Sequence, residues 1–249
     1  MDQESATDAP TVLELCDLTA GYGALAAIRD VSLHIRAGEV VALFGPNGAG
    51  KSTTLLAAVG GIPRMAGHVN WCGKQTELPL HRLFRAGLAY VPEDRSVTPG
   101  LSVKDNLRLG PGGVDGALSY FPELKLLLPR QAGLLSGGEQ KMLVLARALA
   151  CKPKAILADE ISLGLAPLIV ERLLAALREA AIADGFSVLL VEQQVRRAMA
   201  VADRWYLLNG GRIRAEGDRT VGIAEIEEAY FGEAVDKAGT PEPLSPGNG

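Results

Sequence analysis

The fold is decided by residues 40–53, which read VVALFGPNGAGKST. The first five are apolar and predict a buried strand, and residues 54–59 continue as an apolar helical pattern. A glycine-rich loop between a strand and a helix lets backbone N–H groups surround phosphate oxygens, and the positive end of the helix dipole points at them. The pattern G-x-x-x-x-G-K-S therefore predicts a site for the phosphates of a nucleoside triphosphate.

The residues of this loop have separate expected roles. Lys51 is placed to reach the β- and γ-phosphates, and the hydroxyl of Ser52 is placed to hold Mg²⁺. The alternative is a glycine-rich turn that carries a lysine by chance, and the flanking strand and helix argue against it. The predicted nucleotide-binding residues of the loop are Gly45, Pro46, Asn47, Gly48, Ala49, Gly50, Lys51, Ser52 and Thr53.

The composition limits the class of protein. A chain of 249 residues with a net charge of −4 and no long basic run argues against nucleic acid as the main partner. The cysteines, Cys16, Cys72 and Cys151, lack metal-ligand spacing and indicate reduced thiols. No apolar run approaches the roughly 20 residues of a membrane-spanning helix, so action at a membrane would depend on a partner.

Strand and helix patterns alternate along the chain, which predicts an α/β fold with a parallel sheet covered by helices. Residues 31–35 and 40–44 flank a glycine turn and predict a hairpin that leads into the phosphate loop. Residues 204–208 and 212–216 predict a closing hairpin around Asn209-Gly210-Gly211.

Residues 96–150 differ in character from the rest and predict a helical insertion. Short helices are expected over residues 101–107 and 117–128, separated by a glycine-rich break at 110–113. The expected domain spans residues 11–233, with the core formed by 11–95 and 151–233. Residues 234–249 have little apolar content and predict a disordered tail.

A pair of carboxylates follows the strand predicted at residues 155–158. Asp159 ends this strand, where its carboxylate can complete the Mg²⁺ shell by way of water. Glu160 comes next, near the expected γ-phosphate, and suits a general base that polarises an attacking water. An ordinary acidic strand terminus is the alternative, and the phosphate loop upstream argues against it.

A second glycine motif, LSGGEQ, opens the apolar helical pattern of residues 142–150. Its serine and glutamate fit a capping box, and two glycines with a serine at a helix N-terminus can form another phosphate nest. A capping box on an ordinary core helix is the alternative interpretation. The motif comprises Leu135, Ser136, Gly137, Gly138, Glu139 and Gln140.

LSGGEQ matches the signature of ATP-binding-cassette (ABC) ATPases, and residues 12–232 resemble that family. The resemblance implies a P-loop NTPase (RecA-like) core with N-terminal antiparallel β-strands and a nested α-helical subdomain. It also implies hydrolysis of ATP in a head-to-tail dimer, with each ATP between Lys51 of one chain and the signature of the other. Tyr22 matches the aromatic that stacks on adenine, although an exposed turn tyrosine is a competing interpretation.

Particular stretches are similar to one branch, the ATPase subunits of branched-chain amino acid importers. They are SLGLAP at 162–167, VEQ at 191–193, VPE at 91–93, LSVKDNL at 101–107 and YFPEL at 120–124. The branch implies permease subunits as partners, a second ABC ATPase (itself or a relative), and indirect dependence on an extracytoplasmic solute-binding protein. The chain would then lie at the cytoplasmic face of the cell membrane, held there by the permease.

Three positions depart from the usual family pattern. Glu93 replaces the glutamine near Mg²⁺ and the permease contact, and Gln193 replaces the histidine that senses the γ-phosphate. Both suit the branched-chain branch, whereas Ile161, in place of the proline after the predicted base, has no explanation from the sequence. The resemblance thus implies Glu160 and Gln193 as the residues of catalysis, and Ser52, Asp159 and Glu93 around the metal.

Three other functions compete with this interpretation. Importers of urea or amides would look alike in sequence. A soluble, non-transport ABC ATPase would be favoured by paired cassettes or a long coiled-coil insertion, and neither is present. A P-loop kinase or GTPase is disfavoured by LSGGEQ and by the lack of a guanine-reading N-K-x-D motif.

Overall fold

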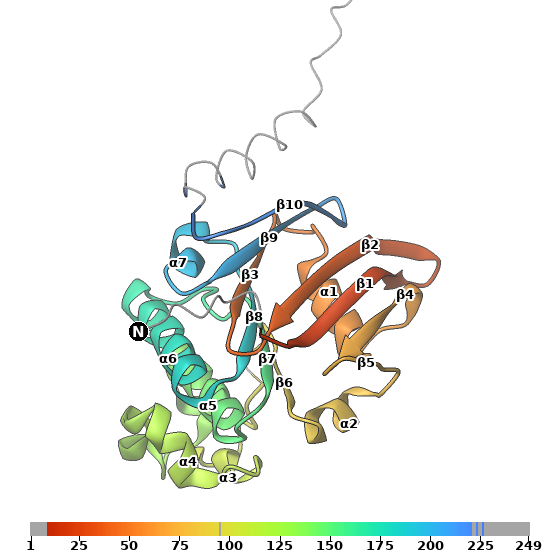
Figure 1. The fold of residues 1–249 in the computed structure, drawn as a ribbon. Coiled ribbons are helices and arrows are strands. Elements are labelled where there is room, and N and C mark those ends of the chain that lie inside the picture. Colours follow the sequence, from red (N-terminus) through yellow and green to blue (C-terminus); the bar gives the residue numbers. More distant parts are fainter. Residues whose placement is uncertain (1–8, 95, 221–222, 224–225, 227–249) are drawn as a thin grey trace, which may run out of the picture.

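The structure is a computed structural model that describes residues 9–94, 96–220, 223 and 226. The described chain forms two sheets, with helices between them and on the outer face of one of them (Figure 1). The predicted tail at residues 234–249 lies outside the described residues.

The larger sheet has the order β10-β9-β3-β8-β7-β6, and all its neighbouring strands are parallel except β9 and β10. The closing hairpin predicted from the sequence is therefore confirmed, because β9 and β10 pair antiparallel. The strands are β3 (Val40–Phe44), β6 (Leu88–Val91), β7 (Ala155–Asp159), β8 (Ser187–Val191), β9 (Arg204–Asn209) and β10 (Arg212–Asp218).

The smaller sheet is antiparallel and has the order β2-β1-β4-β5. The predicted hairpin between residues 31–35 and 40–44 is wrong, because β2 pairs with β1 while β3 lies between β9 and β8. Every residue of β3 is buried, as a central parallel strand requires, and the glycine turn only carries the chain between the sheets. The strands are β1 (Thr11–Tyr22), β2 (Leu25–Arg36), β4 (Arg64–Trp71) and β5 (Lys74–Gln75).

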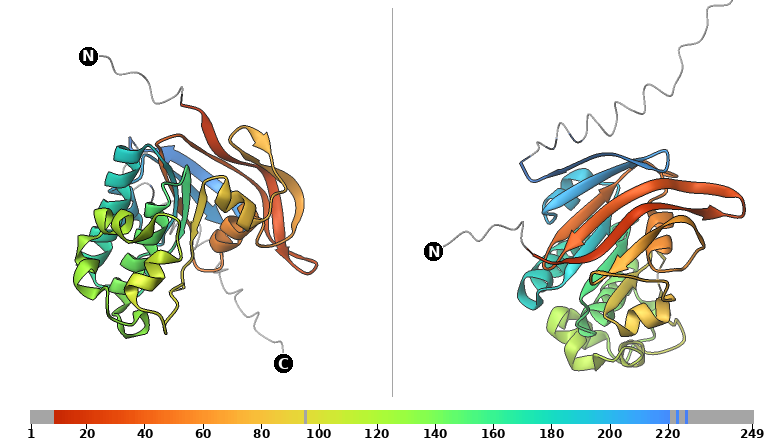
Figure 2. Two further views of the ribbon diagram at one scale, coloured as in Figure 1. Left: turned by 90° about the horizontal axis from the view of Figure 1, so that it is seen from below. Right: turned by 45° about the vertical axis from the view of Figure 1, so that its right-hand side comes forward.

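Strand β3 divides the core between two layers. Val40, Ala42 and Phe44 face the layer that contains α5, α6 and α7, whereas Val41 and Leu43 face α1 and the smaller sheet. Figures 1 and 2 show α1 between the two sheets. The helices are α1 (Lys51–Ala58), α2 (Leu80–Arg85), α5 (Gly137–Ala150), α6 (Pro167–Asp184) and α7 (Val195–Met199).

The segment between β6 and α5 is built of short helical pieces that pack against α5 (Figure 2). The helix predicted over residues 117–128 is wrong, because the chain breaks at Phe121 (φ −132°, ψ 76°) and Pro122 starts a separate 3₁₀ helix. Gly113, predicted as part of a break, instead begins a helix. The pieces are α3 (Val103–Arg108), α4 (Gly113–Tyr120), η1 (Pro122–Leu127) and η2 (Ala132–Leu134).

Arg172 of α6 joins this segment to the core. Its Nε donates to Glu123 Oε1 at 2.8 Å, its Nη2 donates to the carbonyl oxygen of Tyr120 at 2.9 Å, and its guanidinium lies 4.8 Å from the centre of the Phe121 ring. The 3₁₀ turn is thereby held on α6 by three different kinds of contact.

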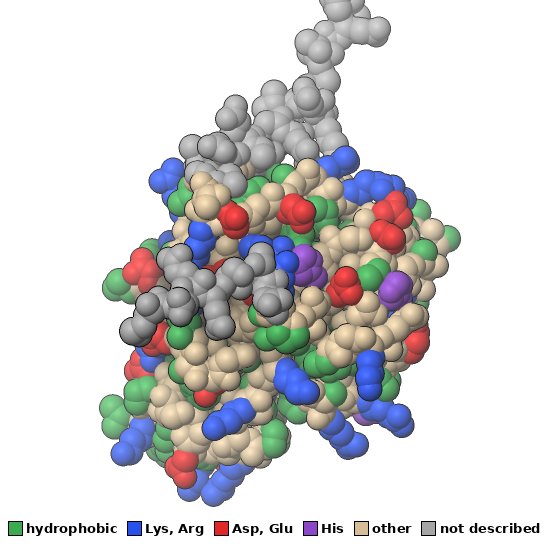
Figure 3. Space-filling view, in the orientation of Figure 1, with side chains coloured by type: hydrophobic (Ala, Val, Ile, Leu, Met, Phe, Trp, Pro, Cys, Tyr) green, Lys and Arg blue, Asp and Glu red, His purple; other side chains and the backbone are tan. Residues whose placement is uncertain are grey.

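Acidic and basic side chains are interspersed over the face of the molecule seen in Figure 3. Across residues 9–94 and 96–220, no helix has the length and apolar character to cross a membrane.

Candidate active site

The phosphate loop connects β3 to α1 and is supported from behind by backbone. A Cβ on Gly45 would lie 2.2 Å from the carbonyl oxygen of Leu208, and a Cβ on Gly50 (φ 104°) would lie 2.5 Å from the Ile28 side chain. Only glycine fits such close approaches without displacing the neighbours. The N–H of Gly211 donates to the carbonyl oxygen of Ala49 at 3.0 Å. The β9–β10 turn and strand β2 therefore fix the shape of the loop.

Lys51 is buried, with 4% of its surface exposed, at the first position of α1. Its ammonium donates to the carbonyl oxygens of Gly45 and Pro46 at 2.9 and 3.2 Å, and it pairs with Glu160 Oε1 at 3.2 Å. The lysine thus lies across the inside of the loop, next to the predicted base.

Glu160 lies directly after β7 and has a left-handed backbone conformation, with φ at 41°. This region is costly for a residue with a side chain, and such strain collects at functional sites. The N–H of Glu160 donates to the carbonyl oxygen of Val191 at 3.0 Å, and Gln193 Nε2 donates to Glu160 Oε2 at 2.7 Å. Lys51 and Gln193 together therefore orient the two oxygens of this carboxylate.

Asp159 and Ser52 are in direct contact. Ser52 Oγ donates to Asp159 Oδ1 at 3.2 Å, and the Tyr90 hydroxyl approaches Asp159 Oδ2 at 3.5 Å. Burial raises the pKa of the Asp159 carboxyl, and the Ser52 hydrogen bond opposes this effect. These hydroxyl and carboxylate oxygens are hard donors of the kind that Mg²⁺ prefers.

No cluster of three or more His, Cys, Asp or Glu able to hold a metal occurs within residues 9–94 and 96–220. In nucleotide sites Mg²⁺ usually takes one or two carboxylates, with water and the substrate phosphates as its other ligands. The neighbouring oxygens of Ser52 and Asp159 are donors of this kind and would fit a magnesium ion that arrives with the nucleotide.

A cavity of about 430 Å³ at the carboxyl ends of the parallel strands is lined by Lys51, Ser52, Glu160 and Gln193, whereas Asp159 is not part of its lining. Tyr22 is absent from its lining and is 58% exposed at the end of β1. Ala27 belongs to no motif and was not predicted, whereas Leu163 lies in SLGLAP, which matches the family's loop that crosses to the partner after the predicted base. The lining residues are Ala27, Asn47, Gly48, Gly50, Lys51, Ser52, Thr53, Glu93, Glu160, Leu163 and Gln193.

The LSGGEQ motif forms the start of α5. Ser136 Oγ accepts from the N–H of Glu139 at 3.3 Å, and Glu139 Oε2 accepts from the N–H of Ser136 at 2.7 Å, which confirms the capping box. Gly138 allows α5 to pack closely on α6, since a Cβ there would lie 2.8 Å from Ile169. None of residues 135–140 lines the cavity around Lys51.

Two residues beside Glu160 are buried for different reasons. Ile161, 1% exposed, packs into the core on the α5–α6 side. Glu192, also 1% exposed, accepts hydrogen bonds from the backbone N–H of Ser162 at 3.2 Å and from its hydroxyl. Burial raises the pKa of Glu192 to about 7, although these hydrogen bonds oppose it. No sequence motif marked Glu192 as a functional residue on its own.

The strand–loop–helix unit with Lys51, Ser52 and two carboxylates at the sheet edge defines a P-loop NTPase. Residues 28–162 match the sequence profile of the ABC transporter family. The chain belongs to this family and is an ATP-hydrolysing transporter subunit.

Several curated relatives cover most of the chain. It is 39% identical to BraG, a high-affinity branched-chain amino acid transport ATP-binding protein of Pseudomonas aeruginosa, over 85% of this chain and 95% of BraG. A probable branched-chain amino acid transport protein, LivF of Archaeoglobus fulgidus, is 36% identical over 83% and 92%. LptB, a lipopolysaccharide export protein of Escherichia coli, is 35% identical over 87% and 95%.

Solved structures show the same fold. A nucleotide-free ATP-binding cassette of an ABC transporter has a TM-score of 0.78 at 26% identity, over 92% of this chain and 99% of that one. A dimeric cassette in a post-hydrolysis state, bound to ADP and Pi, has a TM-score of 0.75 at 25% identity, over 84% and 99%. Both agree with the α/β core and the antiparallel strands described above.

Proposed function

We propose that this chain powers the import of branched-chain or other amino acids through ATP and Mg²⁺ bound at the cavity around Lys51. The observation that carries the proposal is that Gln193, and not histidine, donates to Glu160. This replacement, together with Glu93, suits the ATPase subunits of branched-chain amino acid importers. The likeness to BraG and LivF supports the same branch.

The chain's own residues have defined tasks in this proposal. Lys51 transfers from Glu160 to the β- and γ-phosphates, which frees a carboxylate that Gln193 continues to orient. Glu160 then accepts the proton of the water that attacks the γ-phosphorus, and ADP and phosphate are the products. Ser52 and Asp159, with Glu93 nearby, would hold Mg²⁺, which when bound neutralises charge on the phosphates.

The site is completed by a second ABC ATPase subunit. The cavity around Lys51 includes no residue of the chain's own LSGGEQ motif, so a signature at the γ-phosphate must come from another chain. The capping box uses the N–H groups of Ser136 and Glu139, and the other N–H groups of this first turn, those of Gly137 and Gly138, suit an anion, as at other helix N-termini. The dimeric cassette with ADP and Pi supports this arrangement. Tyr22 would stack on the adenine from the end of β1.

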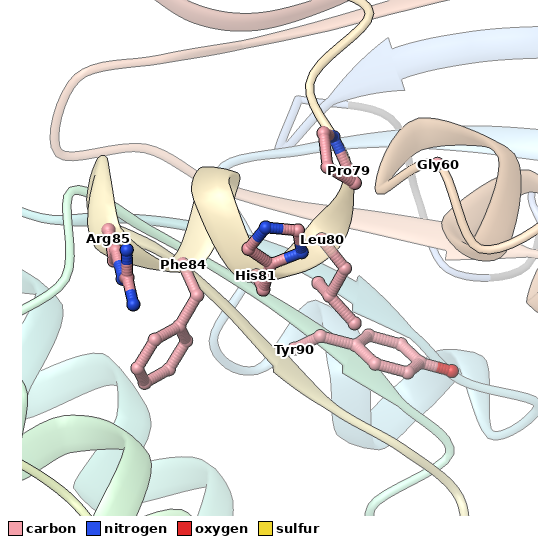
Figure 4. Close-up of a pocket in the computed structure, with 7 residues that line it drawn as sticks. All are labelled: Gly60, Pro79, Leu80, His81, Phe84, Arg85 and Tyr90. Atoms are coloured by element: carbon pink, nitrogen blue, oxygen red, sulfur yellow. The ribbon is translucent and has the colours of Figure 1, made fainter.

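We place the permease contact at a cavity of about 700 Å³ beside α2 (Figure 4). Leu80 and Phe84 are four residues apart on α2 and remain 37% and 43% exposed, and Leu80 points toward the Tyr90 ring. An exposed apolar groove of this kind suits a helix of a partner protein. From Tyr90 the chain runs through Pro92 to Glu93, which lines the nucleotide cavity. This short segment therefore connects the proposed permease contact to the nucleotide. The permease would hold the chain at the cytoplasmic face of the membrane, and a solute-binding protein would act through the permease.

The likeness to LptB supports a second candidate function, energising lipopolysaccharide export. The two candidates separate in vesicles that contain the chain with its permease and its second ATPase subunit. A binding protein loaded with leucine, isoleucine or valine should stimulate ATP hydrolysis in the import case. Stimulation of ATP hydrolysis by lipopolysaccharide instead would support the second candidate. A lack of stimulation by any of these amino acids would count against the import case.

The nucleotide assignment itself is tested by Lys51→Ala. Loss of the ammonium removes the main phosphate contact, so we expect ATP binding in equilibrium dialysis to fall by more than about tenfold. Lys74→Ala, at an exposed lysine of β5, is the matched control and should bind ATP as the native chain does. Native ATP affinity in the Lys51 variant would contradict the phosphate-loop assignment.

A further inference from the structure

Lys141 follows the LSGGEQ motif directly and is buried on α5, with 4% of its surface exposed. Its ammonium leaves the helix and reaches the segment that follows β6. There it donates to the carbonyl oxygens of Pro92, at 3.0 Å, and of Glu93. A single side chain therefore joins the signature helix to a loop nearly fifty positions earlier in the chain.

Burial of the charged Lys141 side chain costs free energy, and the acidic groups around it offset only part of this cost. Burial lowers the pKa of Lys141, because the charged form loses its hydration. Residues one and two turns further along α5, Leu145 and Leu149, are apolar and buried in the core. The acidic side chains that favour the charged ammonium are Asp94, Glu93, Asp159 and Glu192.

The two ends of this connection face different nucleotides in the proposed dimer. Ser136 caps α5 little more than one turn before Lys141, at the surface offered to the partner's ATP. Glu93 lines the cavity for the chain's own ATP. Since a helix of 14 residues moves as a rigid unit, a displacement of Ser136 is carried through Lys141 to the backbone of Glu93.

We propose that Lys141 is a positioning residue that couples the nucleotide bound by this chain to the nucleotide held by its signature. The inference rests on the proposed function, which assigns those two contacts to Glu93 and Ser136. Lys141 touches neither nucleotide and acts through the loop carbonyls. Its loss leaves the phosphate loop and the capping box intact.

A second connection on the same helix provides a control. Arg147 Nη2 donates to the carbonyl oxygen of Ser96 at 2.8 Å, further from the cavity than Glu93. Arg147→Met therefore removes a bond between α5 and the same segment without releasing the Glu93 backbone. A general loosening of the helix would affect both variants equally, whereas a specific connection would affect only Lys141→Met.

The test is a double-mutant cycle on the complete transporter. Glu93→Gln, Ser136→Ala and their combination are prepared in the native, Lys141→Met and Arg147→Met backgrounds, and kcat/KM for ATP hydrolysis is measured. In the native background we expect the combined effect to depart from the product of the single effects by about fivefold or more. In Lys141→Met the two effects should become independent, and in Arg147→Met the native coupling should persist.

The outcomes separate the inference from the proposed function. Unchanged coupling in Lys141→Met, or equal loss in Arg147→Met, overturns the role of Lys141 alone. Single changes at Glu93 and Ser136 with no effect on hydrolysis overturn both the inference and the assigned contacts. Thermal unfolding reports the folding of each variant. If Lys141→Met does not fold, Lys141→Gln, which keeps an amide donor at shorter reach, replaces it and is expected to reduce the coupling.

Discussion

The Glu160 carboxylate is held in a strained backbone position between an ammonium and an amide, which is an arrangement suited to a base. Glu160→Gln keeps the shape of the side chain but removes the proton acceptor, and its one amide oxygen can accept from Lys51 or from Gln193 but not from both. We expect the rate of ATP hydrolysis to fall by about 10²–10⁴-fold, with ATP trapping the closed dimer. Phosphate release and size-exclusion chromatography measure the two effects.

The matched control for this change is Glu171→Gln, at an exposed glutamate of α6, which should hydrolyse ATP at the native rate. Native turnover in Glu160→Gln would show that another group accepts the proton.

The buried Glu192 carboxyl should make the free energy of unfolding depend on pH. Its pKa is raised by burial to about 7 from an ordinary 4.5, so the folded state binds this proton more tightly than the unfolded state does. The stability from this group is present below pH 4.5 and is lost as the pH rises through 7. Glu192→Gln does not titrate, so its free energy of unfolding relative to the native chain should rise by about 2–3 kcal/mol between pH 5 and pH 8.

Urea unfolding of both chains at the two pH values measures this difference. Glu171→Gln again serves as the control, since Glu171 is exposed and lacks the buried surroundings of Glu192. A constant difference between Glu192→Gln and the native chain would show that the buried carboxylate is not destabilised when charged.

The residues of the site were predictable where a motif fixes their spacing. Lys51 and Ser52 follow from the phosphate loop, and Asp159 and Glu160 follow from the end of a buried strand, because parallel strands finish at one edge of the sheet. Lys141 and Ala27 were not predictable, because their roles depend on contacts with segments distant in the chain.

At the scale of elements, the pairing of strands was harder to predict than their positions. The glycine turn before β3 is a local feature and indicated a hairpin, but burial of β3 on both faces decided its partners. The prediction of one helix over residues 117–128 was wrong for a similar reason, since Pro122 interrupts an otherwise regular apolar pattern.

The attachment of that segment to α6 can be measured through Arg172. Arg172→Ala removes the ion pair with Glu123, the bond to the Tyr120 carbonyl and the contact with the Phe121 ring. Because the site is only partly buried, we expect the free energy of unfolding to fall by roughly 1–3 kcal/mol. Urea denaturation measures the change.

Arg108→Ala is the control for this element. Arg108 pairs with Asp105 at 3.4 Å on an exposed face of α3, and such pairs contribute little, so its loss should change stability by less than about 0.5 kcal/mol. Equal effects of the two substitutions would show that Arg172 does not hold the segment on α6.

For the whole molecule, Gln193 predicts unequal sites in a heterodimer. Glutamine donates as a neutral amide, whereas a histidine can donate while charged, and charge-assisted hydrogen bonds are about twice as strong. If the partner subunit carries the usual histidine, its site should turn over faster than the one built on Lys51, Asp159 and Glu160. The measurement is hydrolysis by the heterodimer with the predicted base of one subunit replaced at a time.

Hydrolysis should fall further when the partner's glutamate is replaced than when Glu160 is replaced. Equal losses, or a larger loss from Glu160→Gln, would mean that Gln193 positions the attacking water as well as a histidine does. The ATPase assignment would stand in either case.

The support of the phosphate loop by the β9–β10 turn limits how far the chain can be shortened. All the nucleotide motifs lie between Tyr22 and Gln193, so a minimal fragment ending there would look complete on paper. Such a fragment would lack the Leu208 carbonyl behind Gly45 and the Gly211 N–H that binds Ala49. The phosphate loop would then lack the backbone that supports it from behind. A split-protein design should therefore place its break elsewhere and keep residues 204–218 in the same fragment as the phosphate loop.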